Sequence, residues 1–177
     1  MGKSFLLVIL VLLGVFTFGC KSVSKYAIDD QPHVKIDTNL IGIWKMQEDT
    51  DVHNYFVIER YDDYSYAVTY MNKGGSNRRY ENFGMFMSNV GKSQFFNMSY
   101  VEWDASGPSY KGYFFLKVQT ISEGGWNMEL AMVSDPTLRE VTTKEELRRR
   151  ILTKAQDPAF YDKTLHFKKI LPLMYCR

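Results

Sequence analysis

Alternation of apolar and polar residues is the dominant pattern in the middle of the chain. In the stretch 64–72, Tyr66 and Val68 fall on one face, and Ala67 and Thr69 fall on the other. A period of two is typical of a strand with one buried face. Similar runs, bounded by turn-forming residues, predict seven strands at residues 40–46, 55–60, 64–72, 79–88, 94–101, 110–120 and 126–133.

The pattern changes from strand-like to helical after the seventh run. Thr143 stands three residues before Glu146, the spacing of a capping box, and apolar residues then recur at helical spacing. This predicts one helix over 143–155, and two Asp-Pro pairs on either side of it predict further helix starts. An eighth strand is expected at 164–171.

Short turns between consecutive strands favour pairing of sequence neighbours. The sequence therefore predicts a mainly β fold, an antiparallel eight-stranded up-and-down barrel with one α-helix before the last strand. Eight strands enclose a space that side chains fill or that holds one small ligand. Ordinary core packing and a ligand cavity are both open for the residues expected to point inward, which are Tyr66, Val68, Phe96, Met98, Phe114, Leu116, Met128, Leu130 and Phe167.

The N-terminal apolar run is too short to cross a bilayer as a helix. Lys3 precedes an almost unbroken apolar stretch, 5–18, of about 14 residues, whereas a span needs roughly 20. A short apolar run after a positive charge is typical of a secretory signal. We expect a signal peptide at 1–19, a flexible tether at 20–39 because that segment has no sustained apolar period, and one barrel domain at 40–177.

Cys20 directly follows Gly19, and the sequence becomes polar at Lys21. A cysteine after a small residue at this boundary resembles the lipobox of bacterial lipoproteins, in the loose form found among Bacteroidetes-like lipoproteins. The resemblance implies cleavage before Cys20, palmitate-like acylation of that residue and anchoring in the cell envelope, in the outer membrane since Lys21 rather than Asp follows. An ordinary secretory signal with a chance cysteine and an uncleaved inner-membrane anchor remain alternatives.

Gly42 and Trp44 form a Gly-x-Trp motif on the first predicted strand. This motif, the eight-strand meander and the helix before the last strand resemble the lipocalin-like (calycin) barrels over about residues 40–171. The resemblance implies that Trp44 plugs the closed end of the barrel beneath a basic side chain near the last strand, and either Lys168 or Lys169 fits that place.

Neither the composition nor the motifs indicate a set of residues that could carry out catalysis. Without residues 1–19 the chain keeps 21 of its 22 basic side chains against 20 acidic ones, a near balance that gives no reason to expect a nucleic-acid partner. With Cys20 acylated, only Cys176 would remain, so no intramolecular disulfide is expected. The three histidines form no H-x-H or H-E-x-x-H pair, and no G-x-S-x-G elbow occurs. We expect no enzyme, no metal site and no cofactor.

The sequence thus leaves two functions open. The first is a membrane-anchored lipoprotein whose barrel binds a small apolar or amphipathic ligand in the cell envelope. The alternative is a solid-cored interaction module that supports an envelope complex or binds a glycan, through aromatic residues around one loop: Tyr100, Trp103, Tyr110 and Tyr113. An interior void above roughly 300 Å³ would favour the first function.

Overall fold

The computed structural model describes residues 23–74, 77–104 and 107–172. The predicted signal peptide and Cys20 lie outside the described residues, as does Cys176. The strands are β1 (Gly42–Met46), β2 (Tyr55–Arg60), β3 (Ser65–Gly74), β4 (Asn77–Val90), β5 (Ser93–Asp104), β6 (Gly107–Tyr110), β7 (Phe114–Ile121), β8 (Asn127–Val133) and β9 (Tyr161–Leu171). The helices are η1 (Thr38–Leu40), η2 (Glu123–Gly125), η3 (Pro136–Glu140), α2 (Lys144–Lys154) and η4 (Pro158–Phe160).

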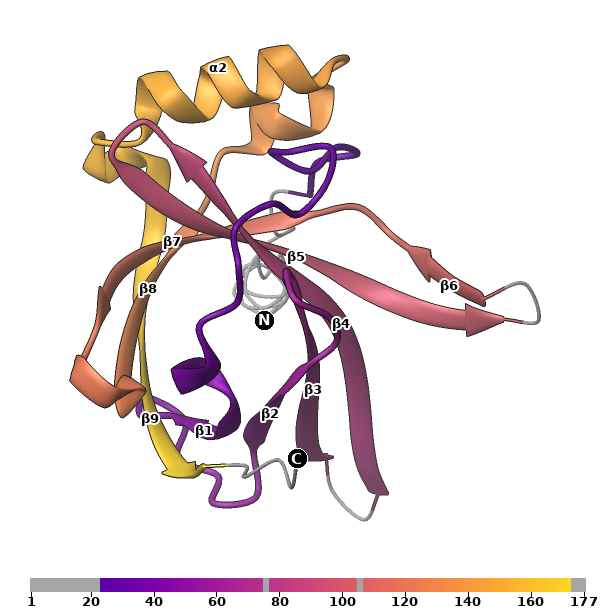
Figure 1. Ribbon diagram of the computed structural model, residues 1–177, viewed down its shortest axis with the longest axis vertical. Coiled ribbons are helices and arrows are strands. Elements are labelled where there is room, and N and C mark those ends of the chain that lie inside the picture. The colour runs from indigo at the N-terminus through magenta and orange to yellow at the C-terminus, as the bar shows by residue number, and fades with distance from the viewer. Residues whose placement is uncertain (1–22, 75–76, 105–106, 173–177) are drawn as a thin grey trace, which may run out of the picture.

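Eight of these strands close into an antiparallel barrel (Figure 1). Strands β1 to β5 pair in turn, β5 then pairs with β7, and β7, β8 and β9 pair in turn until β9 closes the ring on β1. Strand β6 pairs with β5 and lies outside the ring. Closure leaves no exposed edge in the ring itself. The predicted mainly β fold, an up-and-down eight-stranded barrel with one helix before the last strand, is confirmed.

The strand predicted at 110–120 begins later, as β7 at Phe114, and its first residue, Tyr110, instead ends β6. Between β6 and β7, Gly112 has φ +68°, a left-handed conformation that L side chains rarely adopt, and an added Cβ would lie 2.4 Å from Val23 Cγ1. Backbone hydrogen bonds of 2.7 Å join Ser24 and Tyr113 in both directions. The alternation of apolar and polar residues could not predict this break, because the break is caused by contact with Val23 and Ser24, which are distant in the sequence. The β5–β6 hairpin projects away from the barrel (Figure 1).

The three predicted N-caps form, although the Glu146 side chain of the predicted capping box accepts from the Thr142 N–H and not from the Thr143 N–H. The Thr143 side chain accepts a hydrogen bond from the Glu146 N–H at 3.2 Å at the start of α2. Asp135 and Asp157 cap η3 and η4 in the same way, each before a proline at the first helical position. These short helices turn the chain so that α2 lies outside the barrel (Figure 1).

Two hydrophobic clusters lie on opposite sides of the barrel wall. The inner one lies inside the barrel, and the outer one packs α2 against the outer faces of β5, β7 and β8. Leu147 and Ile151 of α2 are fully buried in the outer cluster, against Phe95 and Phe115 of the barrel. Burial of a large apolar side chain contributes about 1.5–3 kcal/mol, so α2 is a structural part of the domain.

Residues 23–39 differ from the predicted flexible tether, because they pack on the barrel. Ile28 is only 2% exposed and joins the outer cluster. Its N–H donates to Asn97 Oδ1 at 2.8 Å, and the neighbouring Asp29 and Asp30 form ion pairs with Arg148 and Lys144 of α2. We call residues 23–33 the strap. Its single buried isoleucine and its dependence on distant partners explain why no periodic pattern marks it.

Candidate functional site

The nine residues predicted to point inward all lie in the inner cluster, where each is at most 8% exposed. Their alternation is sufficient to place them, since successive side chains of a strand point to opposite faces. Their role in binding a ligand stays a prediction.

The barrel encloses a cavity of about 260 Å³, which we call the inner cavity. Seven of the nine predicted residues line it: Val68, Met98, Phe114, Leu116, Met128, Leu130 and Phe167. Its volume falls short of the roughly 300 Å³ that would favour ligand binding over a solid core, and so lies below the range of about 300–1,000 Å³ that is typical of ligand pockets. An engineered apolar cavity of about 150 Å³ nevertheless holds benzene, so the space suffices for a small ring or a short chain.

The other two predicted residues, Tyr66 and Phe96, do not line this cavity and lie toward the barrel's closed end. Their rings meet edge to face with centroids 6.5 Å apart. The Tyr66 hydroxyl accepts a hydrogen bond from the Asp37 N–H at 2.7 Å, and burial raises the pKa of Tyr66 to about 12. Tyr66 therefore fixes the chain segment that crosses the end of the barrel.

Sequence reasoning missed the contribution of β4 to the inner cavity. Phe83 and Met85 line it, and both are nearly fully buried. The outward position between Met85 and Met87 is occupied by another apolar residue, Phe86, so β4 does not alternate cleanly in sequence. Register supplies the missing information, since Phe83 stands opposite Val68 and Tyr100 on the flanking strands.

The mouth of the inner cavity is polar. Glu81 and Lys163 line it near the ends of β4 and β9, beside Tyr70. Burial raises the pKa of Tyr70, with smaller contributions from the charges of Asp49, Glu81 and Asp51. An apolar interior below a charged and hydroxylated rim suits an amphipathic molecule.

Trp44 and Lys169 close the opposite end. Trp44 is fully buried and its Nε1 donates to the Leu40 carbonyl at 2.8 Å. Lys169 is 5% exposed, with Nζ 5.0 Å from the Trp44 ring centroid and donating to the Asn39 carbonyl. The basic partner of the Gly-x-Trp motif is thus Lys169 and not Lys168. Gly42 is required at the same place, because it has φ +152° and an added Cβ would lie 2.8 Å from the Leu171 carbonyl oxygen.

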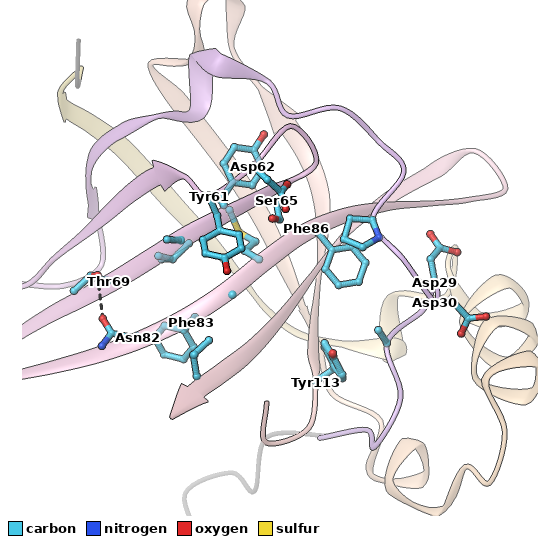
Figure 2. A pocket seen from close by; sticks show the side chains of 18 residues that line it. Asp29, Asp30, Tyr61, Asp62, Ser65, Thr69, Asn82, Phe83, Phe86 and Tyr113 are labelled. Carbon is cyan, nitrogen blue, oxygen red and sulfur yellow. Dashed lines mark hydrogen bonds between the residues drawn. The ribbon is translucent and has the colours of Figure 1, made fainter. Parts of the chain in front are cut away.

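A second hollow, of about 390 Å³, lies on the outer face of β3 and β4 beside the strap, and we call it the outer groove (Figure 2). Its floor includes Ala67 and Gly84, two small residues that face each other across the strand pair. Aromatic rings and carboxylates surround this floor. The side chains labelled in the figure are Asp29, Asp30, Tyr61, Asp62, Ser65, Thr69, Asn82, Phe83, Phe86 and Tyr113.

The histidines do not meet in the described part of the chain. His33 lies 3.7 Å from an oxygen of Asp29, and His166 pairs with Glu48 beside the β1–β2 loop. Within residues 23–74, 77–104 and 107–172, no three His, Cys, Asp or Glu side chains gather as a potential metal site. No helix within those ranges is both long enough and apolar enough to span a membrane.

The fold and these hollows define the class: an eight-stranded antiparallel β-barrel, consistent with a lipocalin-like fold and compatible with ligand binding. Comparison with family models, with curated proteins and with solved structures finds no match for this chain.

Proposed function

We propose that this chain is a non-enzymatic lipoprotein, anchored in the cell envelope through acylated Cys20, whose barrel binds one small apolar or amphipathic molecule. The observation that carries the proposal is the inner cavity, with its methionine and phenylalanine walls and a charged rim. Methionine adapts its shape to irregular contents, and five methionines line the space: Met46, Met85, Met98, Met128 and Met132.

The open mouth of the inner cavity supports entry of a ligand. An apolar chain or ring inside the barrel would be removed from water, which contributes about 25 cal/mol per Å² of apolar surface buried. The polar end of an amphipathic molecule would remain in contact with Glu81 and Lys163 at the mouth.

Titration of the purified full chain with a fluorescent fatty-acid probe and with retinol tests the proposal. Met132 lines the cavity near its mouth and is half-buried, so Met132→Trp should obstruct entry without disturbing the closed end. We expect this variant to weaken probe binding at least about tenfold, or about 1.4 kcal/mol. The matched control is Asn127→Trp, which adds the same ring at an exposed position of the same strand.

Two results would contradict a ligand in the barrel. One is no uptake of either probe by the unmodified chain. The other is uptake that Met132→Trp and Asn127→Trp reduce equally, since that pattern would place the probe outside the cavity.

A further inference from the structure

The outer groove has the chemistry of a site for an uncharged ring compound, and it is separate from the inner cavity. Its residues on β3 and β4 include the outward-facing Ser65, Ala67 and Thr69 of β3, whose side chains point away from the barrel interior. At about 390 Å³ it is the larger of the two hollows and falls within the usual range for ligand pockets.

The walls of the groove are aromatic. Tyr61 is 59% exposed, and Phe86 lies opposite Ser65 on the neighbouring strand. The rings of Phe86 and Tyr113 meet edge to face, with centroids 6.5 Å apart. Ala67 and Gly84 face each other on the floor of the groove, and because Gly84 has no side chain and that of Ala67 is small, a flat ring can approach the sheet surface there. Aromatic faces of this kind stack on the C–H face of another ring.

Polar groups stand at several points around the same groove. Thr69 Oγ1 donates to Asn82 Oδ1 at 3.1 Å at one end, and Asp62 and Ser65 lie near Tyr61 (Figure 2). At the strap side, Asp29 is not available to a ligand, because its Oδ1 pairs with Arg148 and its Oδ2 is buried 3.7 Å from His33 Nδ1.

The charged residues in and around the outer groove indicate which class of ligand it can bind. No Lys, Arg or His is among the described residues that line the groove, which disfavours an anion. Asp29 and Asp30 are already paired with Arg148 and Lys144, which weakens attraction for a cation. Partial burial acts to raise the pKa of Asp62, but hydrogen bonds from the Tyr64 N–H and from Ser65, with the Arg60 charge, outweigh it and the pKa is lowered. Asp62 therefore stays an ionised acceptor at neutral pH.

We propose that the outer groove binds a neutral saccharide, with sugar rings against Tyr61, Phe86 and Tyr113 and sugar hydroxyls bonded to Asp62 and Asn82. A polyhydroxylated ring meets both requirements of the site, an apolar C–H face for the rings and hydroxyls distributed around its edge for the Asp62 carboxylate and the Asn82 amide. A simple amine would use one carboxylate and leave the other polar groups of the groove without partners.

The test is calorimetric titration of the full chain, in a detergent without a sugar headgroup, with maltohexaose, cellohexaose and N-acetylchitohexaose. Ala67→Phe should abolish binding by filling the groove, and Asp62→Ala should weaken it about tenfold or more through loss of a charged acceptor. Lys168→Phe is the matched control, since it adds the same ring at an exposed position of β9, outside the groove. Uptake of the fatty-acid probe by Ala67→Phe should be unchanged, which separates this site from the inner cavity.

The proposal is overturned if none of the three sugars binds at millimolar concentration, or if Ala67→Phe and Lys168→Phe bind them equally. It is also overturned if benzyltrimethylammonium binds in the groove while the sugars do not, because the site would then select an organic cation.

Discussion

At the scale of single residues, Lys169 stands out as a charged side chain that is only 5% exposed. It lies between the rings of Trp44 and Trp126, at 5.0 and 5.9 Å from their centroids, and donates to the Asn39 carbonyl. Burial lowers the pKa of Lys169, against a smaller raising effect of Asp37. The ammonium is thus held by ring faces and one carbonyl, which together close this end of the barrel.

Replacement of Lys169 should show how much its buried stem and its charge each contribute to the stability of the domain. Lys169→Ala removes a buried stem and leaves the Asn39 carbonyl without its donor, so we expect a loss of about 2–4 kcal/mol in urea unfolding at pH 7. Because the pKa is lower in the folded than in the unfolded chain, the unfolded chain binds more protons between those two values. Stability of the unmodified chain should therefore rise with pH through that window.

Lys169→Met keeps most of the stem and has no titrating group, so it should lack this rise. The exposed Lys168→Met is the control and should keep the slope of the unmodified chain. Equal slopes for Lys169→Met and the unmodified chain, measured from pH 7 to 10.5, would show that the Lys169 charge does not affect stability.

At the scale of secondary-structure elements, the sequence predicts what depends on local periodicity and fails where distant segments meet. Strand 55–60 matches β2 at both ends, and Thr143 caps α2 as predicted. The strap was not predicted, because Ile28 is one apolar residue in a polar segment whose partners are remote. The outer groove was not predicted either, since Tyr61, Phe86 and Tyr113 come from three separate parts of the chain.

Asn97 is the residue that fixes the strap to the barrel. It is fully buried, accepts from the Ile28 N–H at 2.8 Å, and donates to Ser88 Oγ at 2.8 Å. Asn97→Ala leaves the Ile28 N–H without a partner, at a cost of about 1–3 kcal/mol. We expect faster hydrogen exchange at the amides of Ile28 and Ser24, measured by mass spectrometry, with little change in β2.

Gln94→Ala on the same strand is the control, because Gln94 is exposed and should leave the strap protected. If Asn97→Ala accelerates exchange uniformly over the whole barrel, Asn97 supports global stability and not the strap in particular.

At the scale of the whole molecule, packing of the strap changes the geometry of the proposed anchor. A flexible tether over 20–39 would allow the barrel to move far from the membrane. Since the chain packs on the barrel from Ser24 onward, only the few residues after Cys20 separate the acylation site from the folded domain. The four steps from Cys20 to Ser24 span at most about 14 Å, so an acylated Cys20 would hold the barrel close to the lipid surface.

The anchor is tested by comparing the full chain with Cys20→Ser after expression in a bacterium that processes lipoproteins. We expect the unmodified chain to begin at Cys20, to carry the added mass of acyl chains in mass spectrometry, and to sediment with membranes. Two or more acyl chains give stable anchoring, because each buried CH₂ contributes about 0.8 kcal/mol. Cys20→Ser should lack the acyl mass. If its signal peptide is still cleaved, the variant should also be lost from the membrane fraction.

Gly19→Ala is the matched control, because alanine is also small and should preserve processing. A mature N-terminus other than Cys20, or an unmodified thiol at that position, would contradict the anchor. Probe binding in the inner cavity would be unaffected by that result, because the cavity is lined only by residues from Trp44 to Phe167. The location of the protein and the ligand in its barrel are therefore separate questions, and these experiments answer them independently.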